Sequence, residues 1–261
     1  MTLLLLAVAL CAFTAFSLRG GLMAPRGMVV HSLDTNGILL GLAAFGLAAW
    51  LLGPLYGIAL TLSVVVHEFG HVAAYRVAGH SDARFRLVPL MGGVAISNRL
   101  PDTQAESFFI TLMGPGICIA PMVLGFAVSE YFTWRAPEIA HAAWVFAIVT
   151  GALNFFNLLP FWPLDGGRCV KILAQTFWPP LGRVVGMAMS AAFAATALWM
   201  QSTMLFFFAL ISAQSLFSEH DEARYQRPMS RTQGALAAAA YLFTTAAHLW
   251  GGWALLDRYL L

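Results

Sequence analysis

The residues best suited to chemistry lie in one apolar stretch, residues 64–75, which reads VVVHEFGHVAAY. His67 and His71 are four residues apart, so on a helix they project from the same face about one turn apart. This spacing lets two imidazoles bind one zinc ion. Glu68 is placed to reach a metal-bound water without being a ligand itself. HExxH also arises by chance, so the rest of the chain must decide whether this is a metal site.

The composition indicates a polytopic membrane protein. Of the 261 residues, 60% are hydrophobic and only 10% are charged, whereas a soluble domain carries about 25% charged residues. This excludes a soluble zinc protease. The net charge of +2 is small and the arginines lie in loops, so we expect no nucleic-acid partner. The three cysteines lack CxxC spacing and are expected to be small core residues: Cys11, Cys118 and Cys169.

We expect an all-α membrane protein of about six to eight transmembrane helices, forming one membrane-embedded domain over residues 1–261. Its core is expected at 55–183, with peripheral helices at 1–54 and 184–261. A retained first helix is favoured at 1–18 over a signal peptide, because Arg19 follows the apolar run. The other expected spans are 37–52, 55–78, 107–128, 139–159, 184–200, 204–217 and 234–256, with 184–217 as one bent helix being the alternative.

Glycine and proline mark three of these spans. Gly53-Pro54 is expected to separate the second span from the third, and Gly79 is expected to cap the third. Gly114-Pro115-Gly116 interrupts the fourth span, where it would permit a kink and a close approach of helices.

A different pattern follows the HExxH helix. Residues 84–88 alternate polar and apolar side chains, which predicts a strand. Residues 89–96 are apolar, bear glycine and are too short to span. We expect a membrane-inserted β-hairpin or re-entrant loop that dips toward the HExxH stretch, the alternative being an ordinary surface hairpin.

The arginines and lysines divide unequally between the two sides of the eight-span arrangement. One side carries most of them and the other holds only Arg135 and Arg258, so the rich side is expected to be cytoplasmic. His67 and His71 then lie within about two turns of that face. A catalytic zinc site usually has three protein ligands, and the loop that carries Asp165 emerges on the same face. Asp165 is therefore the best candidate for the third ligand.

The loop 157–168 reads NLLPFWPLDGGR. Its two prolines and two glycines argue against a regular helix. We therefore expect Asn157 and Asp165 to be presented from irregular backbone near a membrane face. Asn154 is expected to be a helix-packing amide, and His248 is expected to lie near a span end in a capping or snorkelling role.

The motifs HEFGH in a membrane span and Asn157…Pro160…Leu164-Asp165-Gly166 together resemble the site-2 protease family of intramembrane zinc metalloproteases (peptidase family M50), in a compact form without a PDZ module. The similarity extends to Phe85…Leu87…Pro89-Leu90-Met91-Gly92-Gly93, which looks like that family's membrane-inserted β-hairpin, and to Gly114-Pro115. It covers about residues 55–168 in recognisable order.

The resemblance implies one Zn²⁺ per chain, bound by His67, His71 and Asp165, with Glu68 as general base. It implies that Asn157 helps to orient the substrate or to stabilise the oxyanion. The hairpin residues Phe85, Leu87, Gly92 and Gly93 would bind the substrate.

The function expected from this resemblance is regulated proteolysis within the membrane. The expected partners are a single-span transmembrane substrate, the lipid bilayer and a possible regulatory membrane protein. The expected location is a bacterial or archaeal cell membrane, with the active site near the cytoplasmic face. Two alternatives stay open: a catalytically silent member that binds membrane helices, and a metal transporter whose buried His and Asp line an ion path.

Overall fold

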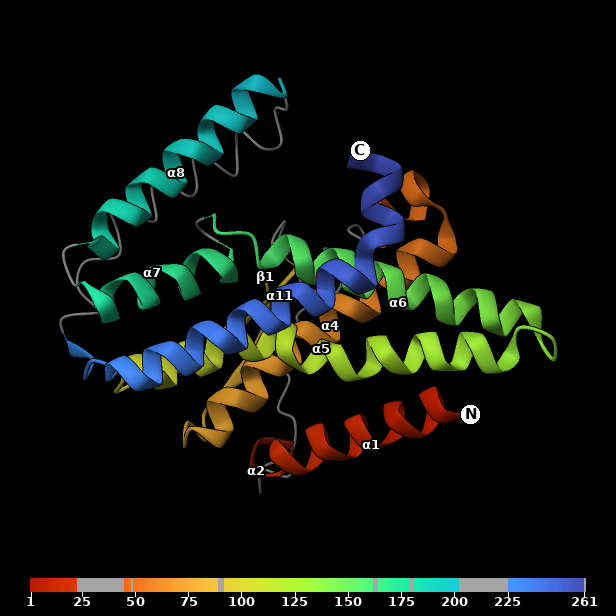
Figure 1. Cartoon of the computed structure of the whole chain (residues 1–261), viewed down its shortest axis with the longest axis horizontal. Helices are drawn as coiled ribbons and strands as arrows, with labels where there is room; N and C mark the ends of the chain where they lie inside the picture. The colour runs from red at the N-terminus through yellow and green to blue at the C-terminus, as the bar shows by residue number, and fades with distance from the viewer. Residues whose placement is uncertain are drawn as a thin grey trace. The chain divides into compact units, whose positions relative to one another are not determined.

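A computed structural model describes residues 1–22, 45–47, 49–88, 92–161, 164–178, 181–201 and 225–260. The described chain is mostly helical (Figure 1), and its residues include one pair of strands between α4 and α5. The elements in order are α1 (Thr2–Ser17), α2 (Arg19–Leu22), α4 (Pro54–Val77), β1 (Arg84–Val88), β2 (Gly92–Ile96), α5 (Gln104–Phe132), α6 (Pro137–Asn157), α7 (Asp165–Phe177), α8 (Leu181–Trp199) and α11 (Arg231–Leu260).

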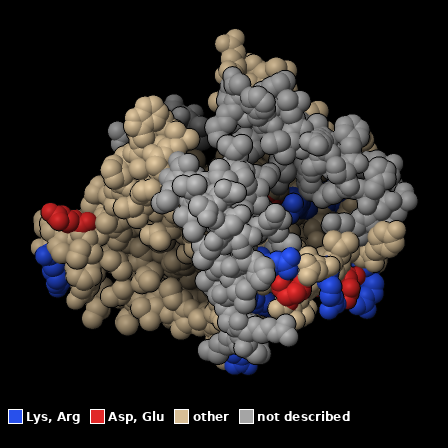
Figure 2. Space-filling model, turned by 180° about the vertical axis from the view of Figure 1, so that it is seen from behind, with Lys and Arg blue, Asp and Glu red and all other residues tan. Residues whose placement is uncertain are grey.

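Three of the described helices, α4, α5 and α6, are long and apolar enough to cross a membrane. They coincide with the expected spans at 55–78, 107–128 and 139–159. α1 is apolar but shorter, and α8 contains a shorter apolar stretch, Met187–Trp199. Most of the expected span 37–52 and all of 204–217 lie outside the described residues. On the face drawn in Figure 2, charged side chains occupy only a few small clusters of the described surface.

The chain divides into two compact units. The first comprises Met1–Arg99, Met113–Phe156 and Thr244–Leu261, and the second comprises Leu100–Leu112 and Asn157–Phe243. Helices α5, α6 and α11 each contribute to both units, because the division falls within or at the end of each helix.

The apolar core of the first unit holds α4 against α6. Ala59 of α4 packs with Val145, Ile148 and Val149 of α6. Partly buried side chains from α5 and α11, among them Phe126, pack against this cluster. Lipid tails are as apolar as these side chains, so van der Waals packing between the helices, and not removal from water, is what holds them together. This packing fixes the helix that carries the HExxH stretch.

The second unit has a separate core built by the start of α5, the residue after α6, the helix α7 and the first part of α11. Its fully buried centre is Leu158, whose carbonyl accepts a 2.6 Å hydrogen bond from the hydroxyl of Tyr241. The members of this core are Phe108, Leu112, Leu158, Cys169, Ile172, Met229, Ala237 and Tyr241. Leu158 therefore fixes the beginning of the loop that leads to Asp165.

The ends of α4 follow the sequence signals. The helix begins at Pro54, directly after Gly53, which has a positive φ of 92°. Proline is favoured there because the first helical N–H has no partner within the helix. The helix ends at Val77, and Gly79 adopts a φ of +95°, the left-handed conformation that glycine supplies after a helix end.

β1 and β2 pair antiparallel, in a register that sets Arg84 opposite Ile96 and Val88 opposite Gly92. The strand expected at 84–88 is therefore present, and its partner follows it directly. The connecting residues 89–91 lie outside the described part of the chain.

Two expectations about local structure were wrong. α5 runs without a break from Gln104 to Phe132, with Pro115 inside it. The loop after α6 is also shorter than expected, because Asn157 is the last residue of α6 and Asp165 is the first residue of α7. The helix can begin there because Gly166 lies against the backbone carbonyl of Leu158, a space that a Cβ atom would fill.

Candidate metal centre

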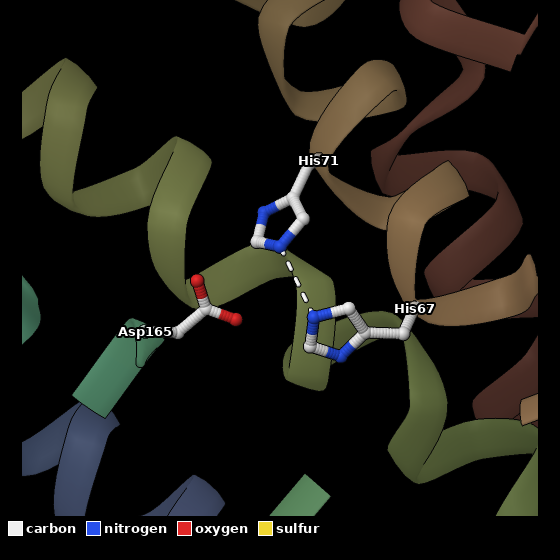
Figure 3. Close-up of side chains that lie close together, drawn as sticks. All are labelled: His67, His71 and Asp165. Atoms are coloured by element: carbon white, nitrogen blue, oxygen red, sulfur yellow. Dashed lines mark hydrogen bonds between the residues drawn. The ribbon is translucent and has the colours of Figure 1, made fainter. Parts of the chain in front are cut away.

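The two histidines of the HExxH stretch converge on one point. The Nε2 atoms of His67 and His71 are 3.2 Å apart (Figure 3, dashed line). Two nitrogens bound tetrahedrally to one zinc ion, each at 2.0–2.1 Å, would be about 3.3 Å apart. His67 is 5% exposed. The pair therefore has the spacing expected of two ligands of one metal ion.

Asn154 of α6 fixes the orientation of His67. Its Oδ1 lies 2.7 Å from the Nδ1 atom of His67, and its Nδ2 donates to the carbonyl of Thr150 at 2.8 Å. Because the amide N–H is used on Thr150, the oxygen faces the ring and accepts the Nδ1–H of His67. This selects the tautomer in which Nε2 carries a lone pair, the form that binds a metal.

A second polar pair lies one turn away on the same two helices. The hydroxyls of Ser63 and Thr150 are 2.6 Å apart, and both residues are fully buried. Ser63 and His67 are four residues apart on α4, as are Thr150 and Asn154 on α6. The two pairs thus link α4 to α6 at two positions one helical turn apart. They fix how far one helix is shifted along the other.

The backbone of α5 passes directly over the imidazoles at Gly114. A Cβ atom at this position would collide with Nε2 of His71 and would lie 3.0 Å from Nε2 of His67. The missing side chain therefore leaves open the space in front of both Nε2 atoms. This open space and the two imidazole nitrogens beside it fit a bound metal ion. The close approach of helices that was expected at Gly114 is also present.

The remaining expected site residues lie on described backbone. Glu68 is partly buried on α4, beside His67. In the second unit, Asn157 ends α6 and Asp165 begins α7, and both are partly buried. Figure 3 draws the carboxylate of Asp165 with His67 and His71; these three side chains offer two imidazole nitrogens and one carboxylate oxygen.

The expected substrate-binding residues belong to the two strands. Leu87 lies opposite Gly93 in the ladder, and Phe85 lies opposite Ala95. Gly92 is paired with Val88. The side chains of Phe85 and Leu87 are not among the described parts of the structure.

Asn154 was expected to be a helix-packing amide, and it does lie buried between α6 and α4; that its partner there is His67 was not predicted. The expectation for His248 was wrong, because it is fully buried and its Nε2 lies 2.8 Å from the carbonyl of Pro115. Gly114 was expected to allow close helix packing, but its role in front of the imidazoles could not be read from spacing.

We predict that Asn154→Leu weakens zinc binding about 10- to 100-fold, the usual loss when a partner that orients a metal ligand is removed. The matched control is Thr150→Val, which removes the neighbouring bond to Ser63 and about 0.5–1.5 kcal/mol of stability but leaves His67 and Asn154 paired. Competition with a chromogenic chelator measures the zinc affinity of both. Equal affinities in the two variants would show that the amide has no part in holding the metal.

Some known proteins with similar sequences are named zinc metalloproteases. The chain is 36% identical over 124 residues to the Mycobacterium tuberculosis protein named zinc metalloprotease Rip3, covering 47% of this chain and 31% of that protein. It is 29% identical over 118 residues to stage IV sporulation protein FB of Bacillus subtilis, covering 44% of this chain and 38% of that protein. The chain thus spans about a third of the length of the curated relatives it matches.

Among solved structures, the site-2 protease from Methanocaldococcus jannaschii matches with a TM-score of 0.46 and 21% identity, over 72% of this chain and 88% of that one. No family model matches the sequence.

Proposed function

We propose that this membrane protein, a member of the site-2 protease family of intramembrane zinc metalloproteases, is a zinc endopeptidase that cuts a transmembrane protein within the bilayer. The observation that carries the proposal is the 3.2 Å distance between the Nε2 atoms of His67 and His71. Asn154 orients the ring of His67, and Gly114 of α5 has no side chain that would fill the space in front of the two nitrogens. These features lie on α4, α5 and α6, which are long and apolar enough to cross a membrane.

Asp165 is the proposed third ligand. Two imidazoles and one carboxylate form a donor set found in catalytic zinc sites, where the fourth position stays open. The chain path supports this choice: Asn154 holds His67, α6 ends one turn later at Asn157, and Leu158 lies against Gly166, next to Asp165.

Bound zinc would lower the pKa of a coordinated water to about 7 and would polarise the peptide carbonyl. Glu68 takes the proton of the attacking water and delivers it to the leaving amine as the peptide bond breaks. The Asn157 amide donates a hydrogen bond to the carbonyl oxygen as negative charge develops on it. His67 keeps its productive tautomer throughout, because Asn154 accepts its Nδ1–H.

The proposed substrate is a single-span transmembrane protein. The carbonyls of a helix are hydrogen-bonded and shielded, so the substrate must unwind before it is cut. An unwound segment could pair with a strand of the hairpin, held by the stretch that contains Phe85, Leu87, Gly92 and Gly93. β2 packs against α4, which supports a position close to the HExxH helix.

The proposed setting is a multi-pass arrangement of six to eight spans, one domain over 1–261 with its core at 55–183, in a bacterial or archaeal cell membrane. The active site would lie near the cytoplasmic face, as the arginine distribution indicates. A membrane partner would regulate access to it.

Zinc removal tests the proposal. The purified chain is reconstituted into vesicles with a single-span protein, and cleavage is followed by gel electrophoresis. Chelation should abolish cleavage, and one equivalent of zinc per chain should restore it. Zinc movement across the vesicle membrane, measured with a trapped fluorescent indicator, should be absent. Zinc flux without cleavage would instead identify a transporter, and co-purification of membrane helices without either activity would identify a silent binding protein.

A further inference from the structure

A second polar cluster lies outside the metal site, where the hairpin meets the end of α4. His80 is 2% exposed and follows α4 by three residues. Asp82 lies in the turn before β1, and Ser97 and Asn98 directly follow β2. The proposed chemistry uses none of these residues. Their contacts lie within the first unit, so they can be described together.

Ser97 is the centre of this cluster. Its hydroxyl donates to Oδ1 of Asp82 at 3.0 Å, and its Oγ lies 2.9 Å from Nδ1 of His80. Because the hydroxyl hydrogen is used on Asp82, the oxygen accepts the Nδ1–H of His80. The backbone N–H of Asn98 donates to Oδ2 of Asp82 at 2.6 Å. One hydroxyl therefore links a buried imidazole to a carboxylate across the open end of the hairpin.

The same cluster is tied to α4. The N–H of His80 donates to the carbonyl of Tyr75 at 3.0 Å, and the two rings meet edge to face with centroids 5.3 Å apart. The Nε of Arg76 donates to the carbonyl of Ala83 at 3.2 Å. Tyr75 lies one turn after His71 on α4. A continuous series of contacts thus runs from the HExxH helix through His80 and Ser97 to the end of β2.

We propose that Ser97 is a positioning residue: the series His80–Ser97–Asp82 clasps the open end of the hairpin to the last turn of α4 and sets where the strands lie relative to the HExxH stretch. The role in cleavage rests on the proposed function, whereas the clasp itself does not.

Charge and register support the clasp. The N–H of Asn98 is the largest cause that lowers the pKa of Asp82 below its ordinary value of 3.8, and the Ser97 hydroxyl adds to it. Asp82 is therefore an ionised acceptor at neutral pH, where charge-assisted hydrogen bonds are stronger than neutral ones. At the open end of the hairpin, the last backbone pair is Arg84 with Ile96. The side-chain bond between Ser97 and Asp82 therefore links the two chain segments beyond that pair.

The test compares three variants in the full chain. Ser97→Ala removes the hydroxyl's bonds to Asp82 and His80, together with the 3.2 Å bond that it accepts from the Arg99 N–H, with almost no change in volume. Ser97→Thr keeps the hydroxyl. Asn98→Ala is the matched control, since it removes the exposed bond from Arg84 at 3.2 Å but keeps the backbone N–H that binds Asp82. Hydrogen exchange of the β2 amides is measured first, because it needs no enzymatic activity.

We expect Ser97→Ala to speed exchange in β2 at least tenfold and to leave zinc content unchanged, with Ser97→Thr and Asn98→Ala close to wild type. Cleavage of a membrane substrate should fall roughly 10- to 100-fold in kcat/KM, as for a displaced positioning group, and Ser97→Thr should restore it. Unchanged exchange in Ser97→Ala would overturn the clasp. Faster exchange with normal kcat/KM would overturn the positioning role. Absence of cleavage by wild type would overturn the proposed function, while the exchange result would still decide the clasp.

Discussion

Replacing Glu68 by Gln is expected to lower the rate of peptide cleavage by about two to four orders of magnitude, with zinc still bound at one ion per chain. Proton transfer by a positioned side chain contributes a factor of this size, and glutamine cannot accept the proton of the attacking water. The substitution keeps the size of the side chain, and the ligands His67 and His71 are untouched. The measurement is the single-turnover rate on a reconstituted single-span protein, together with elemental analysis of zinc.

The control for Glu68→Gln is Glu130→Gln, which removes an exposed carboxylate near the end of α5. This variant should cleave at the wild-type rate. Undiminished cleavage by Glu68→Gln would remove Glu68 from the mechanism. Loss of zinc from that variant would show that Glu68 acts as a ligand and not as the base.

Replacing Asp165 by Ala is expected to weaken zinc binding more than about a hundredfold, which exceeds the loss from a residue that only supports a ligand. Two imidazoles would remain, and a catalytic zinc site usually needs three protein ligands. Cleavage should be lost with the metal. Equilibrium competition with a chelator gives the affinity, and the wild-type chain and Asn154→Leu provide the two reference values.

Asp165 also lies in the first turn of α7, where a carboxylate is favoured by the helix dipole. Asp165→Asn separates the two effects, because it keeps the size and a hydrogen-bond acceptor but loses the charge. It should retain the helical circular-dichroism signal while still binding zinc weakly. Wild-type zinc affinity in both variants would remove Asp165 from the ligand set.

Local signals in the sequence predicted the HExxH helix well. Gly53-Pro54 and Gly79 mark the start and end of α4 to within one or two residues, because proline and left-handed glycine are favoured at these places for steric reasons. The alternation of polar and apolar residues at 84–88 predicted β1, because successive side chains of a strand point to opposite faces. Long apolar runs predicted α4, α5 and α6, since a membrane span requires them.

Features that depend on distant partners were harder to predict. Asn154 holds a residue 87 positions earlier in the chain, and nothing in its neighbourhood distinguishes it from an amide that packs between helices. Gly166 looked like a helix breaker, yet it lies in the first turn of α7, where the carbonyl of Leu158 occupies the place that a side chain would take. Ser97 follows a strand as many serines do, and only the fold brings His80 and Asp82 to its hydroxyl.

Cleavage of a peptide bond inside the membrane is tested by the mass of the products formed when the wild-type chain acts on a single-span protein in a bilayer. We expect two fragments whose new ends fall within the apolar span, formed only when zinc is bound. Fragments cut outside the span, or the same fragments after zinc has been removed, would contradict this expectation.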